Sequence, residues 1–230
     1  PTISNCRILD HVGAGVRLFG GSSPTIEHSE ILGNGDAGVE APTPAGGGRV
    51  FKHAEPLLRQ CIIAGNRAEG IRGGRPTVVN CTITENLREG IDASVLTMTN
   101  SIVYGNSLEA GGVQIDSGRG TITYSDVQGG WEGEGNIDAE PLFAVPGSWA
   151  AGIWTPGDYH LMSQGWRWDA DQGDWVSDAA TSPCIDAGDP AFNLLDEPTT
   201  DPSGAAAANE RINMGAYGGT AEAGLRPPGQ

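Results

Sequence analysis

Five residues at equivalent places in the sequence carry side chains that could do chemistry. Each follows a glycine and then a valine or isoleucine, and together they form a mostly charged set: Arg17, Glu40, Arg72, Asp92 and Gln114. Glu40 or Asp92 could serve as a general acid or base, and Arg72 could bind or stabilise a carboxylate on a uronic acid chain. The same alternation of charge would also suit an ion-pair ladder, in which each exposed pair contributes only about 0 to 1 kcal/mol. Both interpretations stay open.

An internal repeat must position these residues. Copies of one pattern begin at Pro1, Pro24, Pro56, Pro76, Leu96 and Gly120. Each copy has a small residue, with one apolar residue three places before it and another two places after it. The small residues are Cys6, Ser29, Cys61, Cys81, Ser101 and Ser125. A step of two returns to the same face of a strand and a step of three does not, so the pattern predicts a bend near Asn5, Asn80 and Asn100.

The repeat length indicates the fold class. About 20 residues are too few for a strand, a helix and their connections, whereas they suffice for three short strands and turns. The sequence therefore predicts an all-β fold, a parallel β-helix of about six coils over residues 1 to 130, with coils roughly 4.8 Å apart. Asn34, Asn66, Asn86 and Asn106 recur at one turn, where their amides can bond to one another along the stack.

The columns resemble those of right-handed parallel β-helix proteins, the pectate-lyase-like superfamily that includes pectate lyases, polygalacturonases and many bacterial surface proteins. The resemblance implies a right-handed solenoid, and it implies that a substrate would lie along one sheet above outward-facing residues. Glu40 and Asp92 would lie two coils apart, roughly 9.6 Å by strand spacing, which marginally suits an inverting glycoside hydrolase. The Asp-Asp constellation of polygalacturonases and the Arg-rich signature of pectate lyases are both missing.

The chain changes character after Val127. All six tryptophans follow: Trp131, Trp149, Trp154, Trp166, Trp168 and Trp175. The segments GDYHL, SPCIDAGDP and RINMGAYGGT resemble, in this order, the closing segment of secreted β-helix proteins of Planctomycetes and related bacteria. We expect residues 131 to 225 to form an irregular Trp-rich C-terminal cap, with residues 226 to 230 as a flexible tail. Tryptophans can stack on sugars or seal the open end of a solenoid, and we favour sealing.

No cofactor is required by any motif, although Ca²⁺ is possible. Asp169, Asp171 and Gly173 resemble the start of a calcium loop, but no glutamate stands at its twelfth position. A hairpin with Trp168 and Trp175 on either side of the turn explains the same residues without metal. The four histidines lack zinc-ligand spacing.

The four cysteines are interpreted as free thiols. Three share the inward column, where they would act as small apolar residues. Cys61 and Cys81 would be close enough for a bond, but side chains stacked in register point parallel and fit disulfide geometry poorly. Cys184 has no evident partner.

Charge limits the partners. With 29 Asp and Glu against 13 Lys and Arg, the net charge of −16 argues against nucleic acid. No apolar run reaches about 18 residues, so no membrane span is predicted. An insertion at residues 42 to 55 carries a local basic cluster, Arg49, Lys52 and His53, which is either a surface loop or the wall of a binding groove.

The start of the sequence predicts that the N-terminal end of the solenoid is covered. The sequence opens inside a repeat, so strand edges and core residues would face outward there. We expect missing residues or another subunit to cover this end. A secreted or cell-surface location rests on the family resemblance alone.

Three classes of function remain. The first is a noncatalytic extracellular module, either a surface scaffold or a glycan-binding protein. The second is a polysaccharide lyase or glycoside hydrolase acting on an acidic polysaccharide, and whether the protein is an enzyme stays uncertain. The third is a subunit or fragment of a larger extracellular assembly. The first is favoured because the columns are regular and the catalytic set is incomplete.

Overall fold

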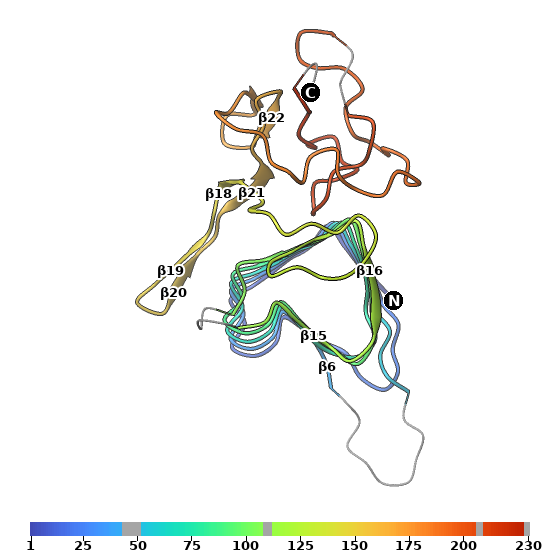
Figure 1. The fold of residues 1–230 in the computed structure, drawn as a ribbon. Coiled ribbons are helices and arrows are strands. Elements are labelled where there is room, and N and C mark those ends of the chain that lie inside the picture. Colours follow the sequence, from blue (N-terminus) through green and yellow to red (C-terminus); the bar gives the residue numbers. More distant parts are fainter. Residues whose placement is uncertain (43–51, 108–111, 206–208, 228–230) are drawn as a thin grey trace.

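The computed structural model describes residues 1–42, 52–107, 112–205 and 209–227. The repeats form a solenoid in which each coil adds strands to parallel sheets, and Figure 1 looks along its axis. The first sheet consists of β1 (Thr2–Ser4), β4 (Thr25–Glu27), β7 (Leu57–Arg59), β10 (Thr77–Val79), β13 (Leu96–Thr99) and β16 (Gly120–Thr123).

The other two sheets complete the coils. The second consists of β2 (Arg7–Leu9), β5 (Glu30–Leu32), β8 (Ile62–Ala64), β11 (Thr82–Thr84), β14 (Ile102–Tyr104) and β17 (Asp126–Val127). The third consists of β3 (Val16–Arg17), β6 (Val39–Ala41), β9 (Ile71–Gly73), β12 (Ile91–Ala93) and β15 (Ile115–Ser117). The predicted all-β parallel β-helix is confirmed.

The predicted core columns stack in register. In the first sheet Ile26 pairs with Ile3 and Leu58, and in the second Ile83 pairs with Ile63 and Val103. Because side chains alternate along a strand, these apolar residues all face the interior, where they form one continuous core.

The predicted bend is present between the first and second sheets. Asn5, Asn80 and Asn100 have φ values of 53°, 48° and 52°, in the left-handed region that asparagine tolerates better than most residues. His28 and Gln60 take the same conformation in the intervening coils. We call this edge the first corner. At this corner the left-handed residue turns the chain, and the residue after it, which is the small residue of the repeat, points into the core.

The predicted asparagine ladder is also confirmed. Asn34, Asn66 and Asn86 each donate a side-chain N–H to the amide oxygen of the asparagine in the next coil, at 2.9, 2.8 and 2.8 Å. The last, Asn106, donates to Gln114 Oε1 at 2.9 Å. These buried amides satisfy one another, so the ladder fixes the stacking of the coils.

The cysteines are free thiols, as predicted. Cys61 and Cys81 are fully buried in the column, where Ser101 Oγ accepts a hydrogen bond from the Cys81 N–H at 3.1 Å. Cys184 does have a partner that the sequence did not reveal, because its thiol donates to Asp126 Oδ2 at 3.2 Å.

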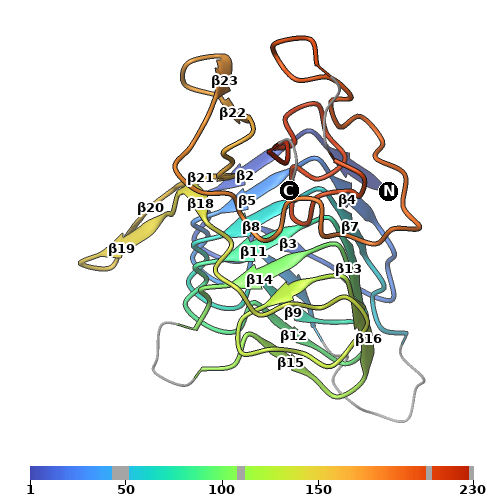
Figure 2. The ribbon, with the colours of Figure 1, turned by 45° about the horizontal axis from the view of Figure 1, so that its top comes forward.

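The C-terminal segment lies against the side of the solenoid rather than across its end. Figures 1 and 2 show the orange and red part of the chain beside the coils. A second hydrophobic cluster joins Leu32, Ile62 and Ile102 of the second sheet to Tyr159 and Met214 of this segment. Among the described residues, only Trp131 of the six tryptophans packs against the solenoid core, so sealing by the whole Trp-rich set is wrong.

Within its described residues, this segment contains three antiparallel strand pairs. They are β18 (Phe143–Val145) with β21 (Asp158–Leu161), β19 (Ser148–Ala150) with β20 (Ile153–Thr155), and β22 (Arg167–Asp169) with β23 (Asp174–Val176). The predicted hairpin is confirmed, since Trp168 pairs with Trp175 across β22 and β23. Trp149 and Trp154 form a second cross-strand pair in β19 and β20. The tryptophans thus stabilise hairpins.

Arg226 and Pro227 differ from the expected flexible tail. Asn209 Oδ1 accepts the Arg226 N–H at 2.7 Å, and the Arg226 guanidinium contacts Asp186 Oδ2 at 2.6 Å, while Pro227 is buried. The remaining three residues lie outside the described part of the chain. Arg226 and Pro227 are therefore packed against the C-terminal segment.

Asp126 gives a pH-dependent prediction. Burial raises its pKa to about 6, so between pH 4 and 6 the folded protein holds a proton that the unfolded chain releases. The bound proton stabilises the folded protein fully when the pH is below the pKa of Asp126 in the unfolded chain. This stabilisation is lost as the pH rises through 6. We expect the free energy of unfolding of the wild type, relative to Asp126→Asn, to fall by about 2 to 3 kcal/mol from pH 4 to pH 7 in urea titrations.

The substitution Asp174→Asn, at an exposed hairpin position, is the control and should show no such trend. A flat difference between wild type and Asp126→Asn across this range would contradict the prediction.

Candidate functional site

The third sheet carries four of the five residues predicted to line its outer face. Arg17 pairs with Glu40, Glu40 with Arg72, and Arg72 with Asp92 in successive strands. The placement of Gln114 was wrong, because β15 begins at Ile115 and the residue beside Asp92 is Asp116. Gln114 is buried instead, and its Oε1 accepts hydrogen bonds from Asn106 at the end of the asparagine ladder.

Arg72 is fully engaged with carboxylates of its own chain. Its terminal nitrogens contact both oxygens of Asp36 at 2.8 Å, Glu40 at 2.9 Å and Glu69 at 3.1 Å. Hydrogen bonding to Asp36 raises the pKa of Arg72 well above its usual range. A uronic acid carboxylate would have to displace one of these partners, so Arg72 is poorly suited to bind an acidic glycan.

Glu40 is held from two sides. Arg17 contacts its Oε2 at 3.0 Å and Arg72 contacts its Oε1 at 2.9 Å, which leaves only 11% of the side chain exposed. Arg88 likewise contacts the buried Glu69 at 3.2 Å. The ion-pair ladder therefore accounts for Arg17, Glu40 and Arg72.

Asp92 and Asp116 lie outside this network. They are direct neighbours on β12 and β15, and Asp92 lines a groove of about 370 Å³ together with Arg72, Ser94 and Pro42. Burial raises the pKa of Asp92, and the nearby charge of Asp116 adds to the effect. Two stacked carboxylates, of which Asp92 has a raised pKa, form a chemical feature of this face that the ion-pair ladder does not absorb.

Lys52 and His53, the described residues of the predicted basic cluster, do not line the groove. Arg49 falls outside the described residues. Lys52 is exposed and His53 half-buried, on the stretch that leads into β7, where Lys52 lies against Gly21. The groove beside Asp92 includes neither of them.

The residues predicted to bind calcium form hydrogen bonds within the β22–β23 turn. Asp169 Oδ1 accepts the main-chain N–H groups of Asp171 at 3.1 Å and Gln172 at 3.0 Å, and its Oδ2 accepts from the Gln172 side chain. No group of three or more His, Cys, Asp or Glu side chains in the described ranges could hold a metal ion. A calcium site at Asp169 and Asp171 stays a prediction without structural support.

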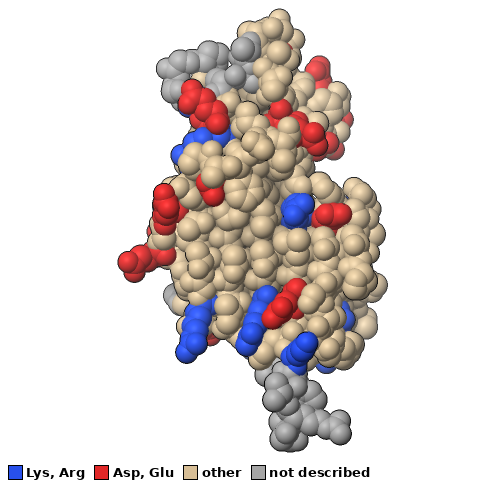
Figure 3. All heavy atoms as spheres, turned by 90° about the vertical axis from the view of Figure 1, so that its right-hand side faces the viewer, with Lys and Arg blue, Asp and Glu red and all other residues tan. Residues whose placement is uncertain are grey.

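The first sheet presents a different surface. Its outer face carries threonines in register, including Thr77, Thr97 and Thr121, and Figure 3 shows few charged residues over it. Threonines suit strands, so this face needs no functional explanation. The part of the chain that the structure describes contains no helix long and apolar enough to cross a membrane.

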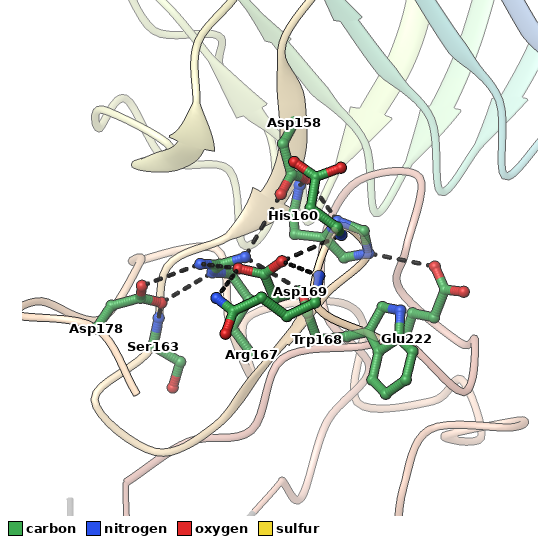
Figure 4. A network of polar contacts seen from close by, with 10 residues as sticks. Asp158, His160, Ser163, Arg167, Trp168, Asp169, Asp178 and Glu222 are labelled. Atoms are coloured by element: carbon green, nitrogen blue, oxygen red, sulfur yellow. Dashed lines mark hydrogen bonds and ion pairs between the residues drawn. The ribbon is translucent and has the colours of Figure 1, made fainter. Parts of the chain in front are cut away.

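The C-terminal segment contains a polar network that the sequence did not reveal. Figure 4 shows His160 between Asp158, at 2.5 Å from Nδ1, and Glu222, at 3.2 Å from Nε2. Arg167 joins Asp158 to Asp178. Burial raises the pKa of Asp158, but the hydrogen bonds and charge of His160 and the charge of Arg167 together outweigh burial and lower that pKa below its ordinary value. Asp158 and His160 are two residues apart, but Glu222 lies 62 residues from His160, so no motif spacing could have linked it to them.

Tyr217 connects this network to the solenoid. Its ring stacks on His160 with centroids 3.6 Å apart. Burial raises the pKa of Tyr217, and the charges of Asp158, Glu222 and Glu30 raise it further. No hydrogen bond joins its hydroxyl to another group in the described part of the chain, and the residue lines the cleft described next.

Beside Tyr217 lies a cleft of about 360 Å³, which we call the corner cleft. It opens between the first corner of coils one to three and the segment 216–222. Its walls combine amides, an imidazole, carboxylates, hydroxyls and small apolar groups: Asn5, His28, Ser29, Glu30, Gln60, Ile62, Ala216, Tyr217, Thr220, Ala221 and Glu222. The size lies in the range of small-molecule sites. A repeat alignment could have pointed to Asn5 and His28, but not to the residues facing them.

Comparison with known proteins agrees with the fold. A family model described as a right handed beta helix region matches residues 1–133. No curated protein and no solved structure matched the chain. The match covers the coils whose strands, bends and ladder are described above, and the chain belongs to the right-handed β-helix family.

Proposed function

We propose that this protein is a noncatalytic glycan-binding module that acts outside the cell or at its surface. The corner cleft carries the proposal, because it combines hydrogen-bonding side chains of several kinds with a small apolar floor. Sugar hydroxyls both donate and accept, so a site with carboxylates, amides and a free tyrosine hydroxyl suits them. The extracellular location follows the resemblance to secreted β-helix proteins.

The third sheet supports the noncatalytic assignment. A hydrolase needs two carboxylates that are free to exchange protons or attack the sugar. Glu40, the predicted partner of Asp92 in this chemistry, is held by Arg17 and Arg72. The engaged guanidinium of Arg72 also weakens the case for an acidic polysaccharide.

A glycoside hydrolase is the second candidate, favoured by Asp92 and Asp116. Strand spacing places the two residues roughly 4.8 Å apart, near the separation of about 5 to 5.5 Å in retaining enzymes. The raised pKa of Asp92 would suit a general acid. This arrangement replaces the inverting pair that the sequence predicted.

One assay separates the two candidates. Neutral and acidic oligosaccharides are incubated with the protein, and both binding and the release of reducing or unsaturated sugar are measured. We expect a neutral oligosaccharide to bind without product release. Release that Asp92→Asn abolishes would establish the hydrolase and contradict our proposal.

Tyr217→Phe tests the location of binding. It removes only a hydroxyl that has no partner in the described chain, so the fold should be retained, while affinity should fall by about fivefold for one lost hydrogen bond. Tyr104→Phe, a half-buried tyrosine outside the cleft, is the matched control and should bind as the wild type does. If the wild type, Tyr217→Phe and Tyr104→Phe bind the glycan with equal affinity, the glycan does not bind in the corner cleft.

A further inference from the structure

The first corner is a strip of side chains that binds main-chain amides. Gln60 Nε2 donates to the Gly218 carbonyl at 3.1 Å, and Asn80 Nδ2 donates to the Asn213 carbonyl at 2.9 Å. Asn100 Oδ1 accepts the main-chain N–H of Asp189 at 2.7 Å. In coils three to five, the residue with positive φ thus holds the C-terminal segment through its amide groups. The strip recognises a secondary amide.

The strip continues past the point where the C-terminal segment leaves it. Asn5 and His28 take the same left-handed conformation in coils one and two, but both are exposed and line the corner cleft. Asn5 Nδ2 donates to Ser4 Oγ at 2.9 Å. Among the described residues, no partner contacts Asn5 Oδ1, Gln60 Oε1 or the ring of His28. Amide-binding groups are therefore open toward this cleft.

We propose that the corner cleft binds a neutral N-acetylated amino sugar. The proposal rests on the glycan-binding function above and names its ligand class. The acetamido group is a secondary amide, like the main-chain groups that the strip holds elsewhere, and it meets Asn5 and Gln60. Its methyl group lies against Ile62 and Ala216, the buried apolar residues of the lining.

Charge limits the ligand to an uncharged sugar. Glu30 and Glu222 line the cleft, and each already has one partner, Arg7 at 2.6 Å and His160 at 3.2 Å. Their remaining lone pairs accept hydrogen bonds from sugar hydroxyls. A uronate or sialic acid would instead place its carboxylate beside these two, which costs free energy at short range.

The shape of the cleft favours a sugar over a peptide. An extended peptide would need a continuous row of partners, whereas the lining gathers its hydroxyl-binding groups, Glu30, Glu222 and Tyr217, around one cavity of about 360 Å³. A single amide with hydroxyls on both sides matches this pattern.

The test compares two disaccharides with the same linkage, N,N′-diacetylchitobiose and cellobiose, by calorimetry. We expect the acetylated sugar to bind the wild type about tenfold more tightly. Asn5→Gly removes the amide at a position whose φ of 53° suits glycine, so it should fold normally and lower this preference by about fivefold. Asp10→Gly is the matched control, an exposed residue of the same coil with φ of 54°, and should keep the full preference.

The outcomes distinguish this inference from the proposed function. Equal binding of both sugars, weakened by Tyr217→Phe, would overturn the acetamido assignment and leave glycan binding in place. N-acetylalanine methylamide carries peptide amides without a sugar. If it binds more tightly than either sugar, the cleft recognises peptide amides and the sugar assignment is wrong. If no sugar binds, both proposals fail.

Discussion

Replacing Asn86 with alanine should cost about 3 to 5 kcal/mol of folding free energy. The side chain is fully buried, and its Nδ2 donates to Asn106 Oδ1 at 2.8 Å and to the Ile63 carbonyl at 3.0 Å. Its Oδ1 accepts the main-chain N–H of Asn66 at 3.0 Å and the side-chain N–H at 2.8 Å. Alanine would leave buried donors and acceptors of two coils unpaired, and each such group costs about 1 to 3 kcal/mol.

Urea unfolding followed by circular dichroism measures this loss. Asn193→Ala, at an exposed position outside the ladder, is the matched control and should change stability by less than about 0.5 kcal/mol. Asn86→Asp should be nearly as harmful as alanine, because a carboxylate accepts but cannot donate. A loss below about 1 kcal/mol for Asn86→Ala would show that water or backbone relaxation replaces the ladder.

The ladder also explains why the solenoid could be predicted from sequence. Each coil needs the same residue types at the same places: an apolar residue, a residue that tolerates positive φ, a small residue and an asparagine. Aligning the repeats therefore places each type in its own column. Neighbouring coils have the same needs, so a column of Asn34, Asn66 and Asn86 predicts contacts as well as conformations. Local order and long-range contact coincide in a repeat protein.

The error at Gln114 has a local cause. Gly112 and Val113 match the glycine and apolar residue that precede the outer-face residue in the other coils. However, Val113 is 53% exposed, and the strand begins at Ile115. The outer-face residue follows the ladder asparagine by six residues in coil four, from Asn86 to Asp92, but by ten in coil five, so the assignment to Gln114 stops two residues short. The pair Ile115 and Asp116 repeats Ile91 and Asp92, and this was the signal that could have placed Asp116 correctly.

The corner cleft could not be predicted because half of it comes from a segment without repeats. His28 and Gln60 belong to recurring columns, whereas Tyr217 and Glu222 reach the same cavity through a long excursion of the chain. Their partners, such as His160, are chosen by tertiary packing that no periodic pattern encodes. The charge pattern of the third sheet was visible, but the sequence did not show Asp36 and Glu69 completing the partners of Arg72.

Glu85 provides the last prediction, because it occupies a backbone position that holds glycine in three other coils. The residue after each of the first five strands of the second sheet has positive φ; it is Asp10 after β2, and Gly33, Gly65 and Gly105 after β5, β8 and β14. Glu85 has φ of 58°, and its carboxylate lies at the base of the β19–β20 hairpin. Its Oε2 accepts hydrogen bonds from Tyr159 Oη at 2.7 Å and Trp154 Nε1 at 3.1 Å. The side chain therefore compensates for an unfavourable backbone conformation.

Glu85→Gly separates these two effects. Glycine relieves the backbone by about 0.5 to 1 kcal/mol, yet it removes the acceptor of two partly buried donors, at about 1 to 3 kcal/mol each. We expect a net loss of about 1 to 5 kcal/mol, and a loss for Glu85→Ala that is larger by the backbone contribution. Amides of residues 148–161 should exchange hydrogen faster in both variants, while those of β8 keep their protection. If Glu85→Gly is as stable as the wild type and the hairpin amides exchange at the same rate, the carboxylate does not anchor the hairpin, and packing of Trp154 against the Gly65 turn holds it instead.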